Sequence, residues 1–116
     1  MMPTCPQCTQ SELEPSTSLE LYPEAFDEIT LIPLNCPKGD FYAVRIYEES
    51  RRGRLDSESV NVNNYSLSQK NFAELQQTIS QCPDPKNIHC KCESHLELNR
   101  KYKNQEFQKN PQVELE

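Results

Sequence analysis

The chain has 116 residues, of which 34% are hydrophobic, none is tryptophan and six are cysteine. Its mean hydropathy is −0.85 and its formal net charge is −6. A domain of this size buries a limited share of its surface, so such a polar chain needs disulfides or a metal besides its apolar core. No apolar run approaches the length of a membrane span, and no secretory signal is evident. We therefore expect one cytoplasmic domain in a reducing compartment, where cysteines stay free or bind metal.

The charge is unevenly distributed between the two halves of the chain. Residues 1–50 carry nine acidic side chains against two basic ones, Lys38 and Arg45. Residues 51–116 carry nine acidic and ten basic side chains, so this half is nearly neutral. An acidic surface repels nucleic acid and anionic membranes and attracts a basic protein surface. The charge therefore favours a basic protein as the partner over a nucleic acid, and excludes a membrane.

The first third of the chain is predicted to be mostly irregular and to lead into a strand. Residues 9–28 are polar and contain two prolines, which indicates a connection with at most a short strand near Leu19–Tyr22. Ile29–Leu34 is the first clear apolar run and predicts a strand. Because Pro33 lacks a backbone donor, we expect this strand to lie at the edge of a sheet or to end at Pro33.

The next segment predicts a β-hairpin. Phe41–Tyr47 is rich in aromatic and β-branched residues and is the clearest strand of the sequence. The polar residues 48–54 predict a loop, and Ser59–Val62 predicts a weaker second strand. Alternate side chains of the first strand form two faces. These are Tyr42, Val44 and Ile46 on one side and Phe41, Ala43, Arg45 and Tyr47 on the other.

Residues 67–81 are predicted to form an amphipathic helix. Ser68 is a suitable N-cap, and three apolar residues follow at helical spacing. These are Phe72, Leu75 and Ile79. Cys82–Pro85 ends the helix, because proline cannot continue it. The expected fold is therefore α+β, with a small antiparallel sheet and one amphipathic helix.

The end of the chain changes in composition. We expect residues 1–96 to form a single zinc-stapled domain, because all the candidate metal ligands lie within them. Residues 97–116 are charged and predict either a solvated helix, with Leu98 and Tyr102 on one face, or a disordered tail.

The strongest motif is the turn Cys5-Pro6-Gln7-Cys8, because the backbone of a Cys-x-x-Cys turn can aim two sulfur atoms at one metal ion. The turn resembles the knuckle of zinc-ribbon and treble-clef proteins, which usually reads Cys-Pro-x-Cys-Gly. Thr9 stands here in the place of the glycine. The resemblance covers this turn alone, so it implies a zinc-ribbon-like knuckle and no function.

Zinc takes four ligands, so a second pair must complete the site. The sequence suggests Cys90-Lys91-Cys92, although its backbone must bend for both sulfur atoms to meet one ion. The expected site is a clasp of Cys5, Cys8, Cys90 and Cys92 around a structural Zn²⁺. Further candidate ligands are Cys36, Cys82, His89 and His95. The segment Cys36-Pro37-Lys38-Gly39 looks like half of another knuckle whose second cysteine is missing.

Two other uses of the cysteines stay open. Four thiolates also suit an iron–sulfur cluster, and six cysteines suit a disulfide framework if the chain is secreted. Four thiolates around zinc would close its coordination shell, which favours a structural over a catalytic ion.

No catalytic motif is present in the sequence. The His-x-Glu pattern of zinc deaminases, His-Glu-x-x-His and Gly-x-Ser-x-Gly are all absent. A glycine-rich phosphate loop cannot form, because Gly39 and Gly53 are the two glycines of the chain. We therefore predict that the protein is not an enzyme and has no small-molecule substrate.

These observations predict a small non-catalytic zinc-binding module for protein interaction. An immunity- or inhibitor-type protein that docks a basic partner through an acidic face is one concrete form of it. The alternative is a nucleic-acid-associated zinc protein that uses the basic tail and an arginine-rich loop. The arginines of that loop are Arg51, Arg52 and Arg54.

Overall fold

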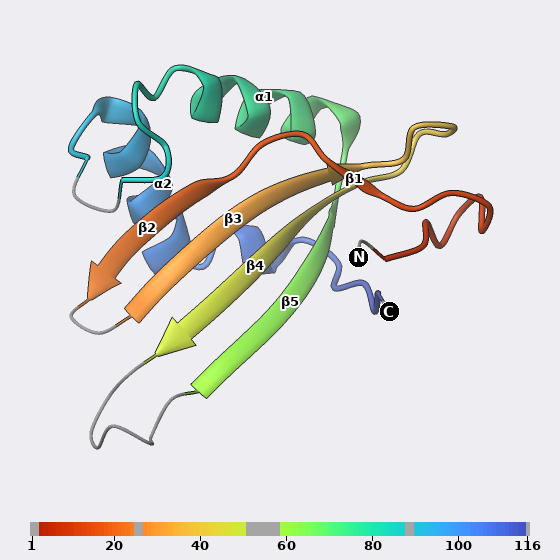
Figure 1. Ribbon diagram of the computed structural model, residues 1–116, viewed down its shortest axis with the longest axis horizontal. Coiled ribbons are helices and arrows are strands. Elements are labelled where there is room, and N and C mark those ends of the chain that lie inside the picture. Colours follow the sequence, from red (N-terminus) through yellow and green to blue (C-terminus); the bar gives the residue numbers. More distant parts are fainter. Residues whose placement is uncertain (1–2, 25–26, 51–58, 88–89, 116) are drawn as a thin grey trace.

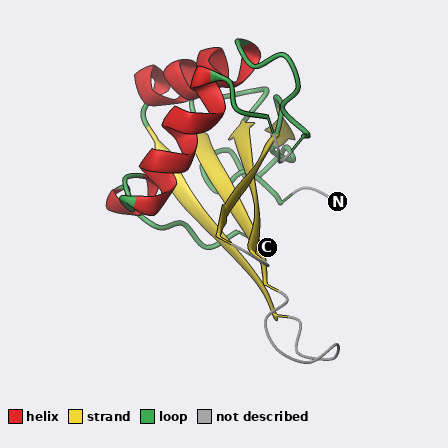
Figure 2. Ribbon diagram, turned by 90° about the vertical axis from the view of Figure 1, so that its left-hand side faces the viewer, coloured by secondary structure: helices red, strands yellow, loops and turns green. Residues whose placement is uncertain are grey.

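The computed structural model describes residues 3–24, 27–50, 59–87 and 90–115. Within them, five strands form one antiparallel sheet (Figure 1), and two α-helices cover one face of it (Figure 2). The elements are β1 (Glu14–Pro15), β2 (Leu19–Glu24), β3 (Asp27–Asn35), β4 (Tyr42–Ser50), β5 (Ser59–Leu67), α1 (Gln69–Ser80), α2 (Glu93–Lys103) and the 3-10 helix η1 (Phe107–Lys109). The α+β class is therefore confirmed, with a second helix in addition to the predicted one. No helix in these ranges is long and apolar enough to cross a membrane.

The strand β3 lies in the middle of the sheet. It pairs with β4 along its whole length, and on its other side with β2 and then with β1. β5 extends the sheet beyond β4, with Tyr42 opposite Leu67. The predicted hairpin is thus confirmed, and both of its strands are longer than predicted. β4 continues through Ser50, so the predicted loop does not begin at residue 48, and residues 51–54 lie outside the described residues.

The prediction that Pro33 places its strand at an edge or ends it is wrong, because β3 has neighbours on both sides and continues to Asn35. The Pro33 carbonyl accepts a hydrogen bond from the Ser16 amide, at 3.1 Å. In an antiparallel strand the N–H and C=O of one residue point to the same side, so the donor that Pro33 lacks would also face Ser16. Ser16 lies in the joint between β1 and β2. Proline is tolerated in this central strand because its missing donor faces a break in the neighbouring ladder.

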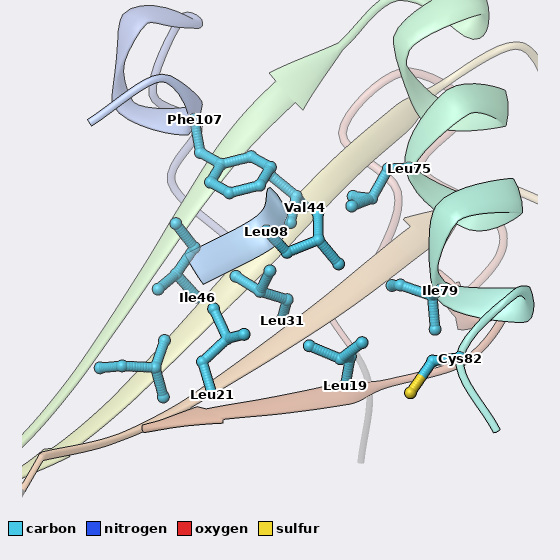
Figure 3. Close-up of a cluster of buried hydrophobic side chains, with 11 residues drawn as sticks. Leu19, Leu21, Leu31, Val44, Ile46, Leu75, Ile79, Cys82, Leu98 and Phe107 are labelled. Carbon is cyan, nitrogen blue, oxygen red and sulfur yellow. The ribbon is translucent and has the colours of Figure 1, made fainter. Parts of the chain in front are cut away.

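The main core lies between the sheet and the helices (Figure 3). The strands supply Leu19, Leu21, Ile29, Leu31, Val44 and Ile46, and the helical segments supply Leu75, Ile79, Leu98 and Phe107. The predicted alternation of β4 is confirmed, because Val44 and Ile46 point into this core while Ala43 packs on the opposite face. Tyr42 also lies on the helical side, with its ring centroid 4.8 Å from that of Phe72.

The helix α1 has the predicted N-cap, Ser68, and is slightly shorter than the predicted range 67–81. The Ser68 hydroxyl accepts a hydrogen bond from the Asn71 amide at 3.1 Å, which satisfies one of the unpaired amides of the first turn. The buried residues of α1 are Phe72, Leu75 and Ile79.

The helix α2 and the segment after it belong to the same fold. α2 runs through residue 96, where the sequence suggests a domain end, and Leu98 and Phe107 are buried in the main core. The last described residues lie beside β5, since the Ser66 amide donates to the Pro111 carbonyl at 2.7 Å. The charged helix expected after residue 96 thus begins earlier, and its apolar side packs rather than being solvated.

A smaller core lies on the opposite face of the sheet, beneath the N-terminal segment. It contains Cys5, Leu13, Leu34, Cys36 and Ala43. The short pairing of β1 with β3, Glu14 opposite Asn35, lays the N-terminal segment over the end of β3. Cysteines therefore enter both cores, Cys82 in the main one and Cys5 and Cys36 in the smaller one.

Candidate metal centres

The cysteines form two groups, each of which is positioned to hold a metal ion. The first group contains Cys82, Cys90, Cys92 and His95, and the second contains Cys5, Cys8 and Cys36. Within each group all the ligand atoms lie within 4.8 Å of one another. All six cysteines are free thiols. We name these groups the four-donor centre and the three-donor centre.

The two predicted pairs do not meet in one site. Cys5 and Cys8 belong to the three-donor centre, whereas Cys90 and Cys92 belong to the four-donor centre. The clasp between the N-terminus and residues 90–92 is therefore replaced by two separate groups. Each pair is joined by residues that the sequence indicates as alternatives, namely Cys36 at the first pair and Cys82 with His95 at the second.

The distances in the four-donor centre suit a tetrahedral zinc ion. With Zn–S near 2.3 Å and Zn–N near 2.05 Å, tetrahedral angles place two sulfur atoms about 3.8 Å apart and a sulfur and a nitrogen about 3.5 Å apart. The Sγ atoms of Cys82 and Cys90 lie 3.8 Å apart, and Cys92 Sγ lies 3.5 Å from His95 Nδ1. Cys82 Sγ lies 3.0 Å from the same nitrogen, so that pair would open by about 0.5 Å on binding zinc.

The link between α1 and α2 positions these donors. Cys82 follows the end of α1, and its amide donates to the Ile79 carbonyl at 3.0 Å. The Cys90 amide donates to the Asn87 carbonyl at 3.0 Å and so closes a turn, and Cys92 is the N-cap of α2. The backbone must bend for the sulfur atoms of Cys90 and Cys92 to meet one ion, and the start of α2 at Cys92 supplies this bend. The first turn of α2 then brings His95 back over Cys92, whose sulfur accepts a hydrogen bond from the His95 amide at 3.4 Å.

His95 is held in the orientation that a metal ligand requires. Its Nε2–H donates to the Glu20 carbonyl at 3.1 Å, which leaves Nδ1 unprotonated and facing the three sulfur atoms. Such a bond from the second ring nitrogen typically orients a metal-bound histidine. The Glu20 amide in turn donates to the Pro85 carbonyl at 2.8 Å. Pro85 of the link and His95 of α2 therefore pair both backbone groups of Glu20 and cover this part of the free edge of β2.

Two thiols of the four-donor centre have opposite acidities. Burial raises the pKa of Cys82 to about 12, and the hydrogen bond from the Asp84 amide, which acts to lower this pKa, offsets only part of the rise. At Cys92 burial also acts to raise the pKa, but hydrogen bonds to its sulfur, chiefly from the His95 amide, outweigh it and lower the pKa to about 6. Cys92 is therefore a thiolate at neutral pH, whereas Cys82 loses its proton only when a cation binds.

The three-donor centre is built on the predicted Cys-x-x-Cys turn. The turn lies at the tip of a short hairpin in which Thr4 pairs with Glu12 and the Cys5 amide donates to the Ser11 carbonyl at 2.8 Å. Thr9 has φ of 59°, the left-handed conformation that glycine would supply in the usual knuckle. The turn therefore forms despite the substitution, at the expense of strain in a β-branched residue.

Cys36 approaches the knuckle from the turn between β3 and β4. Its Sγ lies 3.5 Å from that of Cys8, and its amide donates to the Phe41 carbonyl at 3.0 Å. The Gln10 amide is the main cause that lowers the pKa of Cys8 to about 7, whereas burial raises the pKa of Cys36.

Some predicted site residues lie outside the described residues. These are His89, Arg51, Arg52 and Arg54. His95 is the candidate ligand whose importance the sequence understates. The signal for it is the spacing Cys92-x-x-His95 at the start of a helix, which puts both side chains on one face of the first turn.

Comparisons of the chain with protein-family models, with curated proteins and with solved structures found no match. Function must therefore be inferred from the two centres and the surface around them.

Proposed function

We propose that the protein is a small non-catalytic module that is stabilised by a structural zinc ion in the four-donor centre and binds a basic protein through its acidic sheet face. The observation that carries this proposal is the complete donor set of three cysteines and one histidine. A set of this kind fills the four positions of zinc and leaves none for a substrate or a catalytic water.

The position of the four-donor centre supports a structural role. The metal would join the end of α1, the start of α2 and, through His95 and Glu20, the edge of β2. Binding free energy at such a site becomes folding free energy, because the site does not exist in the unfolded chain. For a chain with this little apolar surface, that contribution would be a large part of the stability of the fold.

The outer face of the sheet is the candidate docking surface. Side chains that alternate with the core residues of β2, β3 and β4 surround a shallow hollow of about 160 Å³. We call this region the acidic face, and its residues are Glu20, Glu28, Thr30, Tyr47 and Glu49. Two valines of β5 adjoin it, Val60 opposite Glu49 and Val62 opposite Tyr47, and they are 50% and 46% exposed. Carboxylates beside exposed apolar groups suit the arginine- and lysine-rich surface of a basic protein.

Native mass spectrometry of freshly purified protein, compared with the mass after acid denaturation, tests the structural zinc. We expect zinc to be bound, to be lost on denaturation and to protect Cys82, Cys90 and Cys92 from alkylation. A metal-free protein whose mass is lower by two hydrogens per cysteine pair would instead show disulfides, and iron with sulfide would show a cluster.

Charge reversal on the acidic face tests the interaction. Affinity capture with the wild type should recover a basic protein, and binding should weaken as the salt concentration rises. Glu28→Lys combined with Glu49→Lys should abolish it. Glu74→Lys with Glu97→Lys is the matched control, because both glutamates are exposed on the helices and the change in net charge is equal. Retention of nucleic acid by the wild type, unaffected by reversal on the acidic face, would favour the alternative function.

A further inference from the structure

The two turns that hold the three-donor centre have the same beginning. Each starts with Cys-Pro, at Cys5-Pro6 and at Cys36-Pro37. In the first turn the Cys8 amide approaches Cys5 Sγ at 3.5 Å, and in the second the backbone of Lys38 hydrogen-bonds to the Cys36 sulfur. The sulfur atoms of Cys8 and Cys36 lie 3.5 Å apart, so the turns face each other across one cluster.

Gly39 occupies the position in the second turn that Cys8 occupies in the first. A Cβ atom added at Gly39 would meet Cys36 Sγ at 3.7 Å, an ordinary van der Waals contact, and the backbone there is not in the left-handed region. A cysteine would therefore fit beside the cluster without strain. The turn supplies one sulfur atom instead of two because of the residue type at position 39, and not because of its backbone.

The side of the cluster next to Gly39 reaches the solvent. Residues 37–40 are exposed and Cys8 is half-buried, whereas Cys5 and Cys36 are buried. Among the described residues no histidine or carboxylate joins the three cysteines within the ligand-to-ligand distance of the group. If three sulfur atoms held a zinc ion here, its fourth coordination position would face the solvent beside residue 39.

We propose that Cys5, Cys8 and Cys36 form a second metal centre, in which three thiolates hold zinc and an exchangeable donor from solution, a small thiol or water, fills the fourth position at Gly39. This centre does not depend on the four-donor centre, whose shell is closed by residues of the chain. The two centres therefore divide the tasks of a metal, one stabilising the fold and the other able to bind an external ligand.

The test uses the full chain loaded with two equivalents of Co²⁺, which replaces zinc and whose absorption reports the number of bound thiolates. Titration with 2-mercaptoethanol should produce a saturable spectral change in the wild type, because the added thiolate displaces water. Gly39→Cys should remove that change. It should also raise the affinity for the second metal, measured by competition with a chelator, by at least the roughly 10–100-fold that loss of an outer-shell partner costs.

Gly39→Ser is the matched control, because it adds a side chain of similar size without a thiol, and it should respond to 2-mercaptoethanol as the wild type does. One metal per chain, with Cys5, Cys8 and Cys36 still open to alkylation, would overturn the proposal. A second metal whose absorption does not change on addition of 2-mercaptoethanol to the wild type would also overturn it. A disulfide between Cys8 and Cys36 would do the same. Protection of Cys82, Cys90 and Cys92 is measured separately, so failure of this centre and failure of the structural zinc are distinguishable.

Discussion

The four-donor and three-donor centres use the same chemistry in two different structural settings. The four-donor centre lies in the link between two helices, and its residues contact the main core and the edge of β2. The three-donor centre lies at two turns beyond the ends of strands, over the smaller core. A donor set closed by the chain strengthens the fold around it, whereas a set one ligand short leaves the metal available to the solvent.

The two centres also differ in what anchors the segments that carry them. α2 is fixed at its start by Cys92 and His95 and further along by Leu98. The turns of the three-donor centre are fixed by backbone hydrogen bonds and by strand pairing, with little apolar contact beyond the smaller core. Loss of metal should therefore disturb α2 more than it disturbs the sheet.

The largest expected effect comes from removing one ligand of each centre. Cys82→Ser should lower the free energy of unfolding of the zinc-loaded protein by about 4 kcal/mol or more, a size typical of losing a metal site. Cys36→Ser is equally buried but should cost only about 2 kcal/mol, mainly for burying a hydroxyl. Urea denaturation measures both values. An equal or larger loss for Cys36→Ser would mean that the three-donor centre is the one that holds the fold.

The next effect concerns the core contact of α2. Leu98→Ala should destabilise the zinc-loaded protein by about 3 kcal/mol, because it leaves a cavity in the main core. Leu96→Ala on the same helix should change stability by less than about 0.5 kcal/mol, since Leu96 is 57% exposed. The cost of Leu98→Ala should shrink when zinc is chelated, because α2 then loses its fixed start. A cost that is unchanged without zinc would show that packing alone anchors α2.

A smaller effect is expected at the strained residue of the knuckle. Thr9→Gly should stabilise the protein by about 0.5 kcal/mol, because relief of about 1–2 kcal/mol of left-handed strain exceeds the entropic cost of glycine together with the loss of an exposed hydrogen bond from the Thr9 hydroxyl. Thr9→Ala keeps the strain and loses the hydrogen bond from the Thr9 hydroxyl to the Cys8 carbonyl, so it should not stabilise. Thermal denaturation distinguishes the two variants, and equal stabilities would argue against strain at this position.

The smallest expected effect is the pH dependence of labelling in the metal-free chain. Alkylation of Cys92 should be half-maximal near pH 6 and that of Cys8 near pH 7, while Cys82 stays protected through neutral pH. Because the pKa of Cys92 is lowered from 9.0, its thiolate stabilises the fold fully above pH 9, and this contribution is lost as the pH falls through 6. Mass spectrometry after brief labelling at a series of pH values measures the order in which the cysteines become reactive. Labelling of Cys92 and Cys82 at the same pH would contradict the prediction.

Local patterns alone predict much of the secondary structure. The N-cap at Ser68 and the spacing of Phe72, Leu75 and Ile79 specify α1, because capping and helical periodicity act within a few residues. The alternation of β4 predicts which side chains face the helices for the same reason. Pro33 shows the limit of such reasoning. Whether proline is tolerated in a strand depends on the neighbour that its missing donor faces, and that neighbour is set by sheet pairing.

The sequence by itself determined the donors, since the six cysteines and His95 are residue types that bind zinc, and it determined that Cys5 and Cys8 lie on one turn. Only the tertiary structure decided which donors lie close enough to share an ion. The pairing of β1 with β3 lays the knuckle against Cys36, and the packing of α1 and α2 on the sheet brings Cys82 to Cys90, Cys92 and His95. The physical reason is that a metal site requires ligand atoms within a few ångströms of one another, and proximity between residues far apart in the chain is a property of the sheet pairing and the core.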